Sequence, residues 1–411
     1  MEKKVKKNCI ESLKKPGYPV VIVALTQEVE AIFNACKDNG IEVAALCDNE
    51  TRKLKQDFGG AELIHTPDLP KKFPKARLII AFHNIQEIVD QLSSMGYQEF
   101  YSSIELLKNY DPSKHQHKLA DSYLKNKISI AIKSHELFFD ESITYLRSLD
   151  IMITTKCSMK CESCANLMQY YKAAKNTDDQ ILSAVEILSK NVDEISEFRV
   201  IGGEPLMNKQ WADIVNGIVE QDNNRKIFVY TNGTIVPKTD QLKSFNGKNI
   251  NFYITDYGNL SRNINKLEES LIDHKINYFR NPAGNWVDRS SITKHNRTPK
   301  DNSILFQECC AKQLYTLLNG RLFTCPFIAN AQELNAIPDN QADYVDLFSK
   351  NVDLKQKIRK LVKMNKFFPA CDFCDGRPYD PTTAKVYDGK GLITAGHQTP
   401  KRQPIAYKEY K

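Results

Sequence analysis

Short apolar runs alternate with amphipathic segments along the first hundred residues of the chain. Runs rich in Val, Ile, Leu and Ala lie at 20–25, 41–47 and 76–82, and a shorter one lies at 62–67. The segments between them, such as 28–40, repeat apolar residues at the spacing of a helix. Strands that alternate with helices indicate a parallel sheet. We therefore predict an α/β domain within residues 1–108, with its sheet starting near residue 16.

The same alternation returns near residue 150. Strand-like runs lie at 149–155, 198–201, 226–230, 251–254 and 276–279, and helical patterns fill 179–191 and 210–221. Repeated βα units favour a full or partial barrel. We place the barrel at residues 150–300, between a polar and helical connector at 109–149 and a C-terminal region at 301–411.

Composition supports a globular protein of two or three domains, since 411 residues include 41% apolar and 26% charged residues. No apolar run is long enough to span a membrane, and no apolar segment follows the basic N-terminus as in a signal peptide. We expect a cytoplasmic protein without a membrane partner. The net charge of +7 lies largely in the two tails, which we interpret as solvated ends rather than a nucleic-acid site.

The eleven cysteines are distributed unevenly, because eight of them fall in three local groups. Thiols stay reduced in the cytosol, so clustering indicates metal ligation rather than disulfides. Cys157, Cys161 and Cys164 follow the first barrel strand, at the end where βα barrels carry catalytic groups. Three thiolates suit a 4Fe-4S cluster with one iron left open. A zinc loop is the alternative, although zinc normally takes a fourth protein ligand.

Glycine-rich polar motifs end the next three strands. They are Gly202-Gly203-Glu204-Pro205, Thr231-Asn232-Gly233 and Asp256-Tyr257-Gly258. Together with the cysteine loop, they resemble the radical S-adenosylmethionine superfamily over about residues 150–280. The resemblance implies a partial (βα)6 barrel, a catalytic 4Fe-4S cluster that binds S-adenosyl-L-methionine, and a flavodoxin- or ferredoxin-type reductant. It also implies a set of cofactor-binding residues: Gly202, Gly203, Glu204, Pro205, Thr231, Asn232 and Asp256.

A second set of thiols lies in the C-terminal region. Its spacing, with a turn at Asn319-Gly320, is similar to a Twitch-like auxiliary-cluster extension, which implies a second 4Fe-4S cluster. The implied ligands are Cys310, Cys325, Cys371 and Cys374. Cys309 competes with Cys310 for its place, and we favour Cys310. A structural zinc at this second site is the alternative.

The N-terminal sheet resembles half-Rossmann units of glycan-biosynthesis proteins. Its first turn, Ala24 to Glu28, contains no glycine, so we expect substrate docking or homodimer formation rather than dinucleotide binding. Asp48 is interpreted as a turn residue. This domain favours a sugar or nucleotide-sugar substrate that is oxidised, epimerised or dehydrated. A peptide-modifying maturase and a zinc-stabilised binding module are the alternatives.

Several side chains are candidates for substrate contact, because Trp stacks on sugar faces and Asp or Arg binds hydroxyls or phosphate. They are Asp256, Tyr257, Arg280, Trp286 and Asp288. Tyr257 and Cys309 are also candidate catalytic residues, as a radical relay or proton donor. Structural roles are open for each of them.

Overall fold

The computed structural model describes residues 5–49, 53–54, 57–58, 60–83, 85–140, 142–172, 180–222, 225–287, 290–307, 309, 311–364, 366–376, 379–380, 385–386, 392–396 and 398. The chain forms two compact units. Unit 1 comprises Met1–Ile143 with Tyr379–Asp388, and unit 2 comprises Thr144–Pro378 with Gly389–Lys411. Within the described ranges, no helix is both long and apolar enough to cross a membrane.

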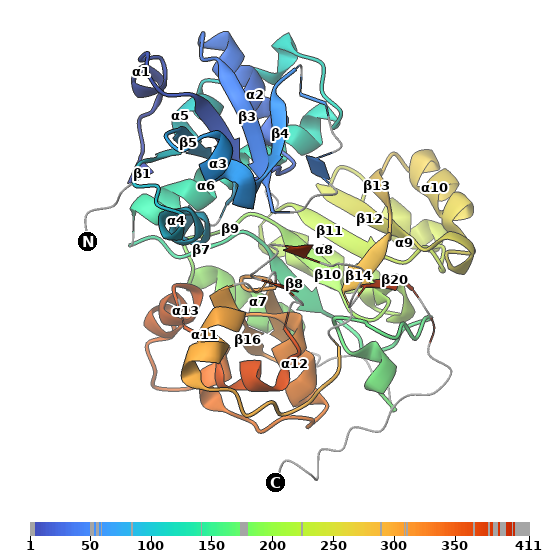
Figure 1. Ribbon diagram of the computed structural model, residues 1–411. Helices are drawn as coiled ribbons and strands as arrows, with labels where there is room; N and C mark the ends of the chain where they lie inside the picture. The colour runs from blue at the N-terminus through green and yellow to red at the C-terminus, as the bar shows by residue number, and fades with distance from the viewer. Residues whose placement is uncertain are drawn as a thin grey trace. The chain divides into compact units, whose positions relative to one another are not determined.

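Unit 1 contains a six-stranded parallel sheet in the order β1-β6-β5-β2-β3-β4 (Figure 1). Without β1, the order is β4-β3-β2-β5-β6, which is that of a doubly wound nucleotide-binding sheet. The predicted parallel α/β sheet is therefore confirmed, but it begins with β1 rather than near residue 16 and includes β6, which the apolar pattern did not predict. Its strands are β1 Val5–Lys6, β2 Val20–Val23, β3 Val43–Asp48, β4 Glu62–His65, β5 Arg77–Ile80 and β6 Phe100–Ser102.

Helices cover both faces of this sheet, because alternate strand residues point to opposite sides. Ile22 and Ile79 share one core with α1 Ile10–Leu13, α2 Val29–Asp38, α5 Ile104–Lys108 and α6 Asp121–Phe139. Val21 and Leu78 share the other with α3 Leu69–Lys72 and α4 Ile85–Ser94.

Helix α6 lies in the segment 109–149 that we predicted as a connector. It buries Leu124, Ile128 and Ala131 in the same core as α2. For this reason unit 1 extends to Ile143 rather than ending at residue 108.

Unit 2 contains an eight-stranded sheet in the order β13-β12-β11-β10-β8-β15-β16-β17. Strands β8, β10, β11, β12 and β13 lie side by side in chain order and are parallel, as predicted for repeated βα units. They are β8 Leu149–Met152, β10 Phe198–Ile201, β11 Ile227–Thr231, β12 Ile250–Asp256 and β13 Asn277–Pro282.

Helices α7 Ile181–Lys190 and α8 Trp211–Gln221 occupy the two segments where the sequence predicts them. Trp211 is almost fully buried, with its ring 5.3 Å from Phe245 and 6.0 Å from Phe252, both edge-on. The other helices of unit 2 are α9 Thr239–Lys243, α10 Ile264–Asp273, α11 Pro299–Gln307, α12 Pro326–Glu333 and α13 Leu354–Val362.

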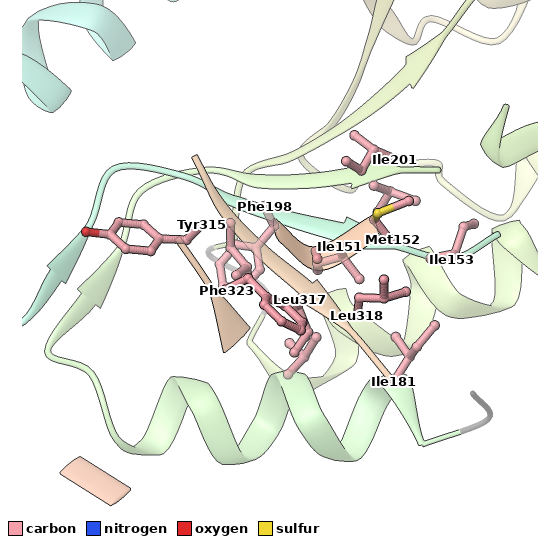
Figure 2. Close-up of a cluster of buried hydrophobic side chains, with 14 of the residues drawn as sticks. Ile151, Met152, Ile153, Ile181, Phe198, Ile201, Tyr315, Leu317, Leu318 and Phe323 are labelled. Atoms are coloured by element: carbon pink, nitrogen blue, oxygen red, sulfur yellow. The ribbon is translucent and has the colours of Figure 1, made fainter. Parts of the chain in front are cut away.

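The C-terminal region adds β15 Tyr315–Leu318, β16 Arg321–Phe323 and β17 Tyr344–Asp346 to this sheet. Strand β15 pairs in parallel with β8, whereas β16 and β17 continue antiparallel. Figure 2 shows Leu317 and Leu318 packed near Ile151 and Ile181, so the hairpin shares the core of the barrel strands.

A two-residue turn joins β15 to β16, as the Asn-Gly dipeptide predicts. Asn319 and Gly320 have φ angles of 48° and 73°. A positive φ at both central residues is characteristic of the tight hairpin turn that Asn-Gly favours. A Cβ atom on Gly320 would lie 2.4 Å from Cε2 of Phe348. Glycine is therefore needed here for both conformation and space.

Three pairs of short strands complete the described structure. Strands β7 Tyr145–Leu146 and β9 Glu194–Ile195 pair in parallel. Strands β14 Asn285–Val287 and β20 Leu392–Thr394 pair antiparallel, as do β18 Tyr379–Asp380 and β19 Lys385–Val386.

Candidate active site

The loop after β8 brings Cys157, Cys161 and Cys164 together at the carboxyl end of the sheet. Burial is the main cause that raises the pKa of each thiol, to about 11 for Cys161. The charge of Cys164 further raises the pKa values of the other two, so the three sulfur atoms share one neighbourhood. The sequence placed these cysteines at this end of the sheet.

Amide donors point at two of the buried thiols. The backbone N–H of Met159 donates to Sγ of Cys157 at 3.5 Å, and Nε2 of Gln398 donates to Sγ of Cys161 at 3.5 Å. Such donors favour the thiolate and oppose the effect of burial on the pKa. These residues fit a group that binds through thiolates.

Among the described residues, no three His, Cys, Asp or Glu side chains are grouped closely enough to hold a single metal ion. The cysteines around a 4Fe-4S cluster each bind a different iron, so they need not converge on one point. The loop offers three thiols, which are the ligand type that such a cluster takes.

The two glycines of the Gly202-Gly203 motif make room for the cysteine loop. A Cβ atom on Gly203 would lie 2.4 Å from the carbonyl oxygen of Lys156 and 2.7 Å from Cβ of Cys157. The backbone N–H of Gly203 donates to the carbonyl of Thr154 at 3.0 Å, and that of Glu204 donates to Lys156 at 2.8 Å. The motif therefore fixes the position of the loop that carries Cys157.

Glu204 joins the ends of β10 and β11. Its fully buried carboxylate accepts from the hydroxyl of Thr231 at 2.9 Å, from the backbone N–H of Asn232 at 2.8 Å and from that of Leu206 at 3.2 Å. Burial raises the pKa of Glu204 to about 7, although these three donors oppose the shift. The motif residue Pro205 follows as the first residue of a short 3-10 helix.

Asn232 connects the strand ends to the cysteine loop. Its Nδ2 atom donates to the hydroxyl of Ser158 at 3.0 Å and lies 3.9 Å from Sγ of Cys157. The buried Ser261 donates to the carbonyl of Asn232 at 2.7 Å and accepts from the backbone N–H of Tyr257 at 2.9 Å. Hydrogen bonds through Glu204, Asn232 and Ser261 thus link the ends of strands β10, β11 and β12 next to the cysteine loop.

Tyr257 lies beside the cysteine loop. Burial is the main cause that raises its pKa, followed by the charges of Cys161, Cys164, Cys157 and Glu204. Its ring meets the ring of Trp286 edge-on at 5.8 Å. Two of the candidate substrate contacts therefore lie together at this site.

Asp256 and Arg280 pair with each other. The guanidinium of Arg280 donates to Asp256 at 2.7 and 3.0 Å and to Glu268 at 2.7 Å. Its hydrogen bonds lower the pKa of Asp256. The carboxylate that we proposed for cofactor binding is thus held by Arg280, and Asp288 lies outside the described residues.

The second cysteine group also forms a shared neighbourhood. Burial raises the pKa of Cys325 well above its ordinary value, and the charges of Cys309, Cys371 and Cys374 raise it further. The sulfur atoms of Cys309, Cys371 and Cys374 accept backbone N–H groups at 3.3 to 3.4 Å. Cys309 therefore lies in this group, whereas the sequence favoured Cys310 as the ligand. Cys310 lies outside the described residues.

Asp48 of unit 1 closes the turn after β2. Its buried carboxylate accepts from the backbone N–H of Leu25 at 2.6 Å and pairs with Lys53 at 3.3 Å. Ala24 adopts a left-handed φ of 79° in this turn, which holds no glycine. Asp48 is thus the last residue of β3, and its carboxylate holds the turn after β2 rather than a turn of its own.

Sequence reasoning missed Ser158, Ser261 and Gln398. Ser158 follows a predicted ligand directly, and Ser261 lies in the polar stretch after Tyr257, so their neighbours gave a weak signal. Gln398 lies 237 residues after Cys161, a separation at which no local spacing can show contact.

Residues 151–268 match the sequence profile of the Radical SAM superfamily. A GTP 3′,8-cyclase of Alkaliphilus metalliredigens is 30% identical over 148 residues, which are 32% of this chain and 45% of that protein. A probable GTP 3′,8-cyclase of Methanocaldococcus jannaschii is 27% identical over 154 residues, 33% of this chain and 50% of that protein. The chain spans about half the length of these relatives.

Two solved structures show weaker likeness. BtrN in complex with AdoMet and 2-DOIA is 13% identical with a TM-score of 0.34, covering 56% of this chain and 93% of that one. The enzyme anSMEcpe with bound AdoMet and the Cp18Cys peptide is 13% identical with a TM-score of 0.37, covering 65% and 93%.

Proposed function

Because residues 151–268 form a domain of the Radical SAM superfamily, we propose that this chain cleaves S-adenosyl-L-methionine reductively and abstracts hydrogen from a sugar or nucleotide-sugar substrate. The observation that carries the proposal is the cysteine loop, whose three thiols gather at the carboxyl end of β8 against Gly203. These thiols would hold a 4Fe-4S cluster, which when bound would supply the single electron for reductive cleavage of S-adenosyl-L-methionine.

The protein groups around the loop have distinct roles in this proposal. Cys157, Cys161 and Cys164 bind three irons, and the Gly202-Gly203 motif holds their loop against β10. Glu204 fixes the ends of β10 and β11 through Thr231 and Asn232, so the groups that face the cofactor are positioned before it binds. Tyr257, which lies beside the cysteine loop, and Trp286, which meets its ring, would shield the bound cofactor from water.

Two aromatic rings support a ring-shaped substrate. The rings of Tyr257 and Trp286 meet edge-on at 5.8 Å, and Tyr257 lies beside the cysteine loop. Tyr230 and Tyr253 also stack, at 4.7 Å, but Arg199 lies over the Tyr230 ring at 5.7 Å, so this ring is engaged within the protein. Aromatic faces next to the site of radical formation suit a sugar or a nucleobase.

The relatives are named for a reaction of the nucleotide GTP, which supports a substrate that contains a nucleotide. Their name, GTP 3′,8-cyclase, places the change at the 3′ position of a nucleotide. For this chain we propose hydrogen abstraction from a sugar carbon, followed by oxidation, epimerisation or dehydration. An electron from a flavodoxin- or ferredoxin-type protein would start each turnover, and unit 1 would dock the substrate or form a homodimer.

The second cysteine group is proposed to hold an auxiliary 4Fe-4S cluster. Cys325, Cys371 and Cys374 are three of its ligands, and Cys309 is the fourth because its charge acts on both Cys325 and Cys371. This assignment replaces Cys310, which we favoured from spacing. The shared neighbourhood of the four thiols supports it.

Anaerobic reconstitution with iron and sulfide tests the chemistry. With dithionite and S-adenosyl-L-methionine, the chain should form 5′-deoxyadenosine, and the triple change of Cys157, Cys161 and Cys164 to Ala should abolish it. Cys36→Ala is the matched control, because Cys36 is a buried thiol of unit 1. Formation of 5′-deoxyadenosine by the triple variant would refute the assignment.

The substrate class is tested separately with deuterated sugars and sugar nucleotides. Deuterium should pass from one sugar carbon into 5′-deoxyadenosine, which identifies both the substrate and the abstracted position. Transfer from a deuterated peptide, with none from the sugars, would favour the peptide-modifying alternative.

A further inference from the structure

A segment near the end of the described chain runs along the edge of the cysteine loop. Strand β20 pairs with β14, with Ile393 opposite Trp286, and the backbone N–H of Ala395 donates to the carbonyl of Gly284 at 3.0 Å. Residues 392–396 and 398, here called the C-terminal strap, thereby lie beside the aromatic pair of the candidate site.

Gly396 lets the strap pass over Tyr257. Its φ angle is 80°, and a Cβ atom there would lie 2.7 Å from Cδ1 of Tyr257 and 3.3 Å from Cδ1 of Leu260. Both the left-handed backbone and the short approach require glycine. The strap and Tyr257 are therefore in direct contact.

Gln398 bonds to the cysteine loop with both ends of its amide. Its Oε1 atom accepts from the backbone N–H of Lys160 at 2.6 Å, and its Nε2 atom donates to Sγ of Cys161 at 3.5 Å. Gln398 and Cys161 also form an antiparallel backbone bridge. One side chain thus holds the loop backbone and points a donor at a thiol.

We infer that the C-terminal strap covers the cysteine loop and that Gln398 is a positioning residue, which raises the reduction potential of the bound cluster through Cys161. Reduction adds negative charge to the cluster and its sulfur ligands, and an N–H donor stabilises that charge. The role in reduction rests on the function proposed above, whereas the covering of the loop does not.

The first test uses the metal-free full-length chain. Deuterium exchange at the Lys160 amide, resolved to single residues, should be at least about tenfold faster in Gln398→Ala because its acceptor is lost. Gln398→Glu keeps an acceptor oxygen and should retain the protection. Thr394→Ala, at an exposed position of the strap, is the matched control and should exchange like the unchanged chain.

The second test is a redox titration of reconstituted protein, followed by electron paramagnetic resonance. The signal that changes on adding S-adenosyl-L-methionine identifies the catalytic cluster. At a fixed potential, the ratio of reduced to oxidised cluster should fall about three- to tenfold in both Gln398→Ala and Gln398→Glu. Thr394→Ala should titrate like the unchanged protein.

The outcomes separate the two parts of the inference. Unchanged exchange at Lys160 in Gln398→Ala would overturn the strap, and an unchanged potential in Gln398→Glu would overturn the donor role. If the unchanged chain takes up no iron, the proposed function fails, while the exchange result still decides whether the strap covers the loop.

Discussion

Gly203 lies where the backbone of the cysteine loop comes closest to β10. Even one methyl group there would meet the Lys156 carbonyl and Cβ of Cys157 at distances that atoms do not adopt. The sequence identified this glycine through its motif and assigned it to cofactor contact. Its observed neighbours are protein atoms, because the loop itself fills the space next to the motif.

Gly203→Ala should displace the cysteine loop without unfolding unit 2. After reconstitution we expect roughly half of the iron to be lost and 5′-deoxyadenosine formation to fall more than about tenfold. Gly217→Ala is the control, because its Cβ would meet only the flexible end of Leu182. Full iron content in Gly203→Ala, measured by colorimetric assay, would contradict the role of the motif.

His135 gives unit 1 a dependence on pH. It is fully buried, with Nδ1 2.8 Å from the hydroxyl of Ser102 and Nε2 2.9 Å from the carbonyl of Phe82. Burial lowers its pKa from 6.5 to about 4. The unfolded chain therefore binds a proton between these values that the folded chain does not.

Neutral His135 contributes about 3 kcal/mol to the free energy of unfolding. This contribution is fully present above pH 6.5 and is lost as the pH falls toward 4. Urea unfolding followed by circular dichroism should show this loss between pH 7.5 and 4. His135→Gln should flatten the dependence. A variant with the same pH profile as the unchanged chain would argue against His135 as its source.

The β15–β16 hairpin is the element that connects the second cysteine group to the sheet. Cys325 lies two residues after β16 and is the N-cap of α12, so its position depends on the turn at Asn319-Gly320. Sequence predicted this hairpin because the Asn-Gly dipeptide is a local signal. Its place beside β8 was not predicted, because strand patterns do not specify which edge a strand joins.

Gly320→Ala should destabilise unit 2 by about 2 kcal/mol, since it combines a left-handed φ with a clash against Phe348. Asn319→Gly is the control, because glycine tolerates the same φ. Thermal unfolding of both variants provides the measurement. Equal midpoints for Gly320→Ala and the unchanged chain would show that the hairpin relaxes freely.

At the scale of the whole molecule, sequence patterns identified the central parallel strands of unit 1 and the parallel strands of the predicted barrel, but not β1, β6 or the place of β15. Apolar periodicity specifies such elements because burial acts on each face locally. Helix α6 packs on the sheet of unit 1, and Gln398 contacts Cys161. Both contacts join segments that lie far apart in the sequence, so no spacing pattern could predict them. Cys309 lies near Cys325 and Cys371, whereas Cys310 lies outside the described residues.

The two cysteine groups predict a division of iron within one chain. If each holds a 4Fe-4S cluster, changing Cys371 and Cys374 to Ala should remove about four of roughly eight irons. Cys309→Ala should do the same and Cys310→Ala should not, with Cys36→Ala as control. The reverse result for Cys309 and Cys310, from iron and sulfide analysis, would restore Cys310 as the ligand.

The pairing of β15 with β8 also bears on how the chain is made. During synthesis, Leu149–Met152 emerges long before Tyr315–Leu318, so one side of β8 keeps unpaired backbone groups until late in translation. Open strand edges recruit other chains. A nascent chain arrested before residue 315 should therefore aggregate or bind a chaperone through β8.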